Sequence, residues 1–214
     1  MKTSLSLIFV ILLPKTSYWF TPKPIEMKYT TVHLLLVMSI SGKSQTVQDF
    51  TLTNVVDGKA VSLSGFKNCQ GIAVIFTSNE CPFDVQYRDR IRELNEQYKG
   101  TIQFLLVNSH LEPRENNKAM AQKFSSWSIP VPYLADKDQT ALDCLGASRS
   151  PEAFLIKKNG ANHTIVYRGA IDDNPLVSGD VNNSFLKMAI DQLLANKPIE
   201  IGNKRAAGCT IRKK

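Results

Sequence analysis

The sequence of 214 residues has few cysteines and histidines, and their spacing excludes several kinds of site. Four cysteines are too few for a small scaffold held together by disulfides. They form no Cys-x-x-Cys or Cys-x-x-Cys-His pattern, and the three histidines form no His-x-x-x-His pattern, so we predict neither a zinc site nor an attached haem. No glycine-rich nucleotide-binding signature occurs either. We therefore expect no metal and no dissociable cofactor.

Long apolar runs are also lacking. Two apolar stretches, Leu5–Leu13 and Val32–Ile40, do not reach the ~20 residues that a membrane-spanning helix needs. The second follows a basic residue after Met27 and precedes small residues, as in a secretory signal peptide; a buried strand or helix is the alternative. We predict a leader at 1–41, with Met27 as a candidate true start, and one domain at 42–214. The domain would be exported to the periplasm or the extracellular space, without a membrane span after cleavage.

Charge of one sign dominates only at the two ends of the chain. The 26 Lys and Arg residues exceed the 19 Asp and Glu residues by seven, but four basic residues lie in 1–41 and five in the last eleven residues. The segment between is close to neutral, so we do not predict nucleic acid as a partner. Apolar residues make up 43% of the chain, which is enough to fill a core and excludes a wholly disordered protein.

From residue 50 onward, strand and helix patterns alternate. Short apolar runs predict strands at 50–53, 60–63, 71–77, 101–108, 133–134, 153–156 and 164–167. Apolar residues at helical spacing predict helices at 82–98, 117–127, 139–145 and 184–194. The first two strands form a hairpin around Asp57-Gly58, and the last two form one around Asn159-Gly160. This order predicts an α/β domain with antiparallel strands at its end.

Cys81 carries the clearest chemical signal. A predicted buried strand leads to it, and Pro82 suits the first position of the following helix. At that place unpaired backbone N–H groups and the helix dipole stabilise a thiolate and can lower the thiol pKa from about 8.5 into the range of about 3.5–7.5. Carboxylates at Glu80 and Asp84 would act in the opposite direction. Cys81 is therefore our candidate reactive thiol, and a small buried apolar residue is the alternative.

Ser150-Pro151 directly precedes a predicted strand. Because proline cannot donate to a strand ladder, Pro151 must stand at the strand's start, where a cis bond fits. The order of five elements carries a family resemblance: the Asp57-Gly58 hairpin, the strand–Ser78-Asn-Glu-Cys81-Pro82–helix unit, Ser150-Pro151, Tyr167–Asp173 and Gly208–Ile211. Over roughly 47–211 the chain resembles the thioredoxin-like superfamily, and within it exported redoxin-domain proteins related to the alkyl hydroperoxide reductase/thiol-specific antioxidant group.

The resemblance implies a thioredoxin fold, in which a central mixed sheet is flanked by helices and extended by an N-terminal β-hairpin. It also implies that Pro151 is cis and packs against the Cys81 loop, where it shapes a substrate groove with Pro82 and Arg149. The expected activity is that of a thiol-dependent oxidoreductase. Its expected partners are protein or small-molecule thiols and disulfides.

The sequence departs from close relatives at Ser78, where they carry the first cysteine of a Cys-x-x-Cys motif. A dithiol cycle within the motif is therefore excluded. In our first hypothesis Cys81 attacks and another thiol resolves the mixed disulfide; the candidates are an external thiol, Cys69, Cys144 and Cys209. Cys209 serves equally well as a structural tether of the tail. Four cysteines allow three full pairings, so connectivity stays open.

Two other hypotheses remain. The Ser78-x-x-Cys81 spacing is similar to the Thr/Ser-x-x-Cys of peroxiredoxins, in which a hydroxyl orients peroxide beside the thiolate, so a one-cysteine peroxidase is the first alternative. The second is a non-catalytic thioredoxin-like binding module that kept the groove and lost the redox couple.

Overall fold

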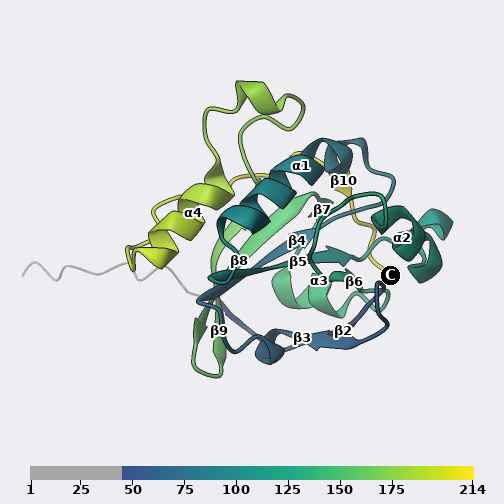
Figure 1. The fold of residues 1–214 in the computed structure, drawn as a ribbon, viewed down its shortest axis with the longest axis horizontal. Helices are drawn as coiled ribbons and strands as arrows, with labels where there is room; N and C mark the ends of the chain where they lie inside the picture. Colours follow the sequence, from purple (N-terminus) through teal and green to yellow (C-terminus); the bar gives the residue numbers. More distant parts are fainter. Residues whose placement is uncertain (1–44) are drawn as a thin grey trace, which may run out of the picture. The chain divides into compact units, whose positions relative to one another are not determined.

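The computed structural model of the protein describes residues 45–214, and the predicted leader at 1–41 lies outside the described residues. Eight strands form a mixed sheet in the order β1-β9-β8-β4-β5-β6-β2-β3, and β7 pairs with β10 in a second, smaller sheet (Figure 1). The strands are β1 Gln45–Val47, β2 Thr51–Asn54, β3 Ala60–Ser62, β4 Gly71–Phe76, β5 Ile102–Asn108, β6 Tyr133–Ala135, β7 Arg149–Ser150, β8 Glu152–Asn159, β9 Asn162–Gly169 and β10 Cys209–Thr210. The helices are α1 Pro82–Gln97, α2 Asn117–Phe124, α3 Thr140–Leu145 and α4 Phe185–Leu194, with 3-10 turns η1 Leu63–Gly65, η2 Pro113–Glu115 and η3 Ser178–Asp180.

The centre of the sheet follows from a continuous apolar run in the sequence. Every residue of β4 is buried, and β4 pairs in parallel with β5 and antiparallel with β8. Because successive side chains of a strand point to opposite faces, Ala73 and Ile75 enter one core, and Ile72, Val74 and Phe76 enter the other. Helices α1 and α4 cover the first face and α3 covers the second (Figure 1). Burying each of these large apolar side chains stabilises the fold by about 1.5–3 kcal/mol relative to leaving it exposed. A strand with apolar side chains on both faces is therefore most stable at the centre of the sheet.

This architecture confirms the predicted thioredoxin fold with its N-terminal hairpin. The hairpin of β2 and β3 joins the sheet through antiparallel pairing of β2 with β6. All predicted strands and helices are present, although β8 and β9 run further than their apolar residues indicated. The sequence analysis missed β1, β7 and β10, because strands of two or three residues are too short to show a periodic pattern.

The site lies where β4 ends and α1 begins. The Ser150–Pro151 peptide bond, between β7 and β8, is cis. Strand β7 pairs antiparallel with β10, so that Cys209 lies opposite Ser150 and Thr210 lies opposite Arg149. This pairing brings the C-terminal segment to the loop that carries Cys81 (Figure 1).

Candidate active site

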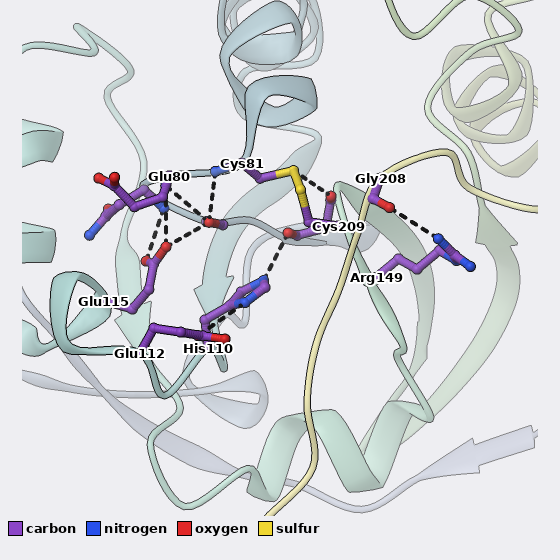
Figure 2. Close-up of a disulfide and its surroundings, with 11 residues drawn as sticks. Glu80, Cys81, His110, Glu112, Glu115, Arg149, Gly208 and Cys209 are labelled. Carbon is purple, nitrogen blue, oxygen red and sulfur yellow. Dashed lines mark hydrogen bonds and ion pairs between the residues drawn. A yellow bond between two sulfur atoms is a disulfide. The ribbon is translucent and has the colours of Figure 1, made fainter.

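Cys81 is the N-cap residue of α1 and is joined to Cys209 by a disulfide bond (Figure 2). Their Cα atoms are 6.0 Å apart, although 128 positions separate them in the sequence. Cys81 is 3% exposed, whereas Cys209 is partly exposed. Cys69 and Cys144 are free thiols that pack against the core on the α3 side of the sheet. The tertiary structure therefore selects one of the cysteine pairings that the sequence left open.

Ser78 holds the loop that leads to Cys81. Its Oγ accepts hydrogen bonds from the backbone N–H groups of Glu80 and Cys81, at 3.0 and 3.1 Å. The same hydroxyl donates to Glu115 Oε1 at 2.6 Å, which uses its single hydrogen. Ser78 is only 2% exposed, and its hydrogen bonds position Cys81 through the backbone.

Glu115, in η2, is a central residue of the site that the sequence analysis missed. Its Oε1 also accepts from the Glu80 N–H at 3.2 Å (Figure 2). Its Oε2 accepts from the Asn79 N–H at 3.0 Å and from Asn108 Nδ2 at 2.7 Å. The carboxylate is buried at 2% exposure, and these donors replace the water that it loses. No sequence pattern links an acidic residue in a polar loop to a motif more than thirty positions earlier.

Glu80, directly before Cys81, is turned toward basic side chains. Its carboxylate lies 3.0 Å from Lys123 Nζ and 3.4 Å from Arg114 Nη1. The hydrogen bond from Lys123, supported by Arg114, holds the pKa of Glu80 below its usual range. The negative charge that the sequence placed beside the thiol is therefore balanced by partners of its own, although exposed pairs of this kind contribute little to stability.

Asp84, in the first turn of α1, is buried at 1% exposure. Thr77 and Ser150 lie close to its carboxyl group, but neither carboxyl oxygen makes a hydrogen bond of normal geometry. Burial, the largest influence on the group, raises the pKa of Asp84 to about 8. The group is therefore mostly protonated at neutral pH and adds no negative charge beside Cys81, contrary to our expectation from the sequence.

The residue before the cis bond closes the site from the other side. The carbonyl oxygen of Ser150 lies 3.4 Å from Cys81 Sγ. The side-chain Oγ of Ser150 lies 2.9 Å from His110 Nε2. On the other edge of the ring, Nδ1 faces Glu112 Oε2 at 3.5 Å. Burial lowers the pKa of His110, which favours the neutral imidazole at pH 7.

Backbone and side-chain contacts hold the C-terminal segment against β7. The Ile211 N–H donates to the Ser148 carbonyl at 2.9 Å, and Arg149 Nη1 donates to the Gly208 carbonyl at 3.0 Å (Figure 2). Ile211 is 4% exposed and packs into the core. A glycine is needed at 208, because a Cβ there would lie 2.2 Å from the Ser150 carbonyl oxygen.

A pocket of about 590 Å³ opens beside the disulfide and is lined by Ser78, Cys81 and Cys209 together with His110 and Arg212. The structure thus brings the predicted site residues Ser78, Cys81 and Cys209 to one cavity. Among the residues from 45 onward, no group of three His, Cys, Asp or Glu side chains is placed to hold a metal ion.

The three predicted groove residues, Pro82, Arg149 and Pro151, are not among the residues that line this pocket. Pro151 follows Ser150 through the cis bond and is buried. Pro82 is exposed at the first helical position of α1. Arg149 contacts the C-terminal segment, so the place predicted for a substrate chain is taken by the protein's own tail.

The sheet, the cysteine at the start of α1 and the cis-proline beside it define a thioredoxin-like protein. The family model described as Redoxin matches residues 42–183, and the chain therefore belongs to the redoxin family of thioredoxin-like redox proteins. None of the curated proteins matches the chain. Within the described part of the chain, the helices are too short or too polar to cross a membrane.

Two solved structures resemble this one over most of their length. The hypothetical protein SMc02350 from Sinorhizobium meliloti 1021 is 27% identical with a TM-score of 0.72, covering 80% of this chain and 94% of its own. An uncharacterized conserved protein from Geobacillus kaustophilus gives the same identity and TM-score, covering 80% of this chain and 92% of its own. The pneumococcal exposed lipoprotein thioredoxin Etrx1 from Streptococcus pneumoniae strain TIGR4 is 22% identical with a TM-score of 0.50, covering 60% and 93%, and shares the fold alone.

Proposed function

We propose that the protein is a thiol–disulfide oxidoreductase whose redox couple is Cys81 and Cys209. The observation that supports this most is the disulfide itself, because it joins a cysteine at a helix start to a sulfur that borders an open pocket. Membership of the redoxin family supports the same conclusion. The couple takes the place of the Cys-x-x-Cys pair that Ser78 interrupts, and no dissociable cofactor is required.

The proposed reaction transfers two electrons between this couple and a partner. In one direction two partner thiols become a disulfide, while the Cys81–Cys209 bond is broken and its sulfurs take up the two protons. In the other direction a partner disulfide is reduced and the Cys81–Cys209 bond forms again. Suitable partners are protein thiols and small-molecule thiols, together with their disulfides.

The other two hypotheses have less support. In a one-cysteine peroxidase the Ser78 hydroxyl would orient peroxide, but it is buried and its hydrogen is donated to Glu115. In a binding module the disulfide would only tether the tail, although the pocket beside it would then have no chemical use. We further propose that the protein is exported by the leader at 1–41 as a single domain at 42–214, since disulfides persist in oxidising compartments.

The test is catalysis of insulin reduction by dithiothreitol, measured beside peroxide consumption. We expect Cys81→Ser and Cys209→Ser each to lower insulin reduction by about 100-fold or more. The matched control is Cys69→Ser/Cys144→Ser, which removes two thiols outside the site and should retain the activity. Turnover that survives Cys81→Ser would contradict the mechanism. Peroxide use without disulfide exchange would favour the peroxidase, and inactivity of the folded wild type in both assays would favour the binding module.

A further inference from the structure

We infer that partner thiols exchange with this couple at Cys209, and that Cys81 is the inner sulfur that closes and opens the internal disulfide. This order rests on the proposed function, and it reverses the roles that the sequence suggested, in which Cys81 attacks and Cys209 resolves. Three differences between the two cysteines support this order: their exposure, the stability of the thiolate that leaves, and the contacts of the chain segment around each cysteine.

Access favours attack at Cys209. The side chain of Cys81 is 3% exposed, and the carbonyl oxygen of Ser150 lies 3.4 Å from its Sγ. Cys209 is partly exposed, and it lines the same pocket as Cys81 and His110. A thiolate must contact the sulfur that it attacks, so a buried sulfur is protected while its partner reacts.

The leaving group favours the same order. Attack at Cys209 expels the Cys81 thiolate, which remains at the start of the 16-residue helix α1, where free N–H groups and the helix dipole stabilise it. Protonated Asp84 and the paired carboxylate of Glu80 leave this stabilisation largely intact. Attack at Cys81 would instead expel the Cys209 thiolate from a two-residue strand that has no helix behind it. A thiol of lower pKa leaves faster, so the first route is favoured.

The way the two cysteines are held also differs. The loop before Cys81 is fixed by Ser78 and by the buried carboxylate of Glu115. Cys209 lies in a strand of two residues, between partly exposed Gly208 and exposed Thr210. Exchange at Cys209 therefore acts on the short strand β10, whereas exchange at Cys81 acts on the start of α1.

The exchange balances in both directions. When the protein accepts electrons, a partner thiolate attacks Cys209 Sγ, the internal S–S bond breaks, and its electron pair leaves with Cys81. A second partner thiolate then attacks the partner sulfur of the mixed disulfide, releasing the Cys209 thiolate and the partner disulfide. When the protein donates electrons, the Cys209 thiolate attacks a partner disulfide, and the Cys81 thiolate then attacks Cys209 Sγ and expels the remaining partner thiol.

The test records which sulfur is attacked first. The oxidised Cys69→Ser/Cys144→Ser protein is mixed with reduced glutathione in a quench-flow apparatus, and N-ethylmaleimide traps the released thiol. Peptide mass spectrometry at the earliest times should find glutathione on Cys209 and maleimide on Cys81 at least about ten times more often than the reverse, as expected if access and leaving group both favour one sulfur. A ratio near one, or an excess on Cys81, would overturn the inference.

Single-cysteine variants in the same background test the burial argument. The variant with Cys209→Ser keeps Cys81 beneath the tail, and we expect its reduced form to react with oxidised glutathione more slowly than the variant with Cys81→Ser. Adding Ile211→Ala to the Cys209→Ser variant loosens the tail and should speed the reaction of Cys81, with circular dichroism checking the fold. An unchanged rate would show that cover by the tail does not protect Cys81 and would overturn the inference.

These results separate the inference from the proposed function. Glutathione on Cys81 in a protein that reduces insulin would overturn only the order of attack. Glutathione on Cys209 in a protein that does not reduce insulin would support the order and contradict the catalytic function. A disulfide that does not react with glutathione on either sulfur would contradict both.

Discussion

The two cysteines of the disulfide lie in opposite kinds of surroundings. Cys81 ends a loop whose backbone N–H groups at Asn79, Glu80 and Cys81 donate to Ser78 and Glu115, and it begins a helix of 16 residues. Cys209 belongs to a two-residue strand between partly exposed Gly208 and exposed Thr210, and the segment around it is held by β7, by buried Ile211 and by contacts of Arg149 and Gln139. One sulfur of the disulfide is thus buried in a loop fixed by hydrogen bonds, whereas the other lies on a partly exposed segment near the C-terminus.

The largest effect is expected when Glu115, the buried acceptor of the loop before Cys81, is replaced. Glu115→Ala removes the acceptor of the Ser78 hydroxyl and of the Asn79 N–H, and one of the two acceptors of the Glu80 N–H and of Asn108 Nδ2. We expect the free energy of unfolding to fall by roughly 3–5 kcal/mol, because several buried donors lose a charged acceptor. Urea unfolding measures the change, and Glu115→Gln, which keeps one oxygen acceptor, is the control with a smaller expected loss. A loss below about 1 kcal/mol for the alanine variant would contradict the fixed character of this loop.

The pH dependence of stability tests the buried state of Asp84, which lies at the same helix start as Cys81. The pKa of Asp84 is raised to about 8 in the folded protein, above its value of about 4 in the unfolded chain. Between these values the folded state holds a proton that the unfolded state has released, so stability falls as pH rises. We expect this group alone to lower the free energy of unfolding by about 1.4 kcal/mol per pH unit from about pH 5 to pH 7.

The check is urea unfolding of the wild type and of Asp84→Asn at a series of pH values. The amide cannot ionise, so the variant should lack this part of the slope while other groups continue to contribute. Parallel slopes for the two proteins would show that Asp84 is ionised in the fold, and Cys81 would then have a negative charge beside it.

On the tail side, Gly208→Ala should separate β10 from β7. The added Cβ would lie 2.2 Å from the Ser150 carbonyl oxygen, so the backbone must move apart. We expect a local cost of roughly 1–3 kcal/mol and slower closure of the internal disulfide, measured by thiol trapping during reoxidation with glutathione. Gly202→Ala, where a Cβ meets nothing within 4 Å, is the matched control. Equal closure rates in the two variants would contradict the need for β10 pairing.

The smallest change in stability is expected from the exposed ion pairs of Glu80, directly before Cys81. Glu80→Gln removes the ion pairs with Lys123 and Arg114, which are partly to largely exposed. We expect a change in the free energy of unfolding within about 1 kcal/mol, since exposed pairs are weak. Unfolding in low and high salt measures it, and a loss well above this value would mean that the ion pairs help to fix the loop before Cys81.

Most of the fold was predictable from the sequence, and so was one half of the site. The continuous apolar run of β4, the Pro82 start of α1 and the proline before β8 are local patterns, and each marks the element that forms there. Glu115 was not predictable, because its partners in the Cys81 loop lie more than thirty positions earlier and polar loops contain many similar acids. The burial of Asp84 was also missed, since a carboxyl group on an amphipathic helix gives no sign that its side faces the core.

Local sequence patterns were enough to predict the thioredoxin fold and the place of Cys81 at a helix start. They also showed that serine replaces the first cysteine of the motif at position 78. Only the tertiary structure decided that Cys209 is the partner of Cys81 and that Cys69 and Cys144 are free. The physical reason is that local patterns fix strands and helices, whereas a disulfide forms between the cysteines that folding brings within bonding distance. Here the pairing of β10 with β7 brings a cysteine 128 positions away to the start of α1.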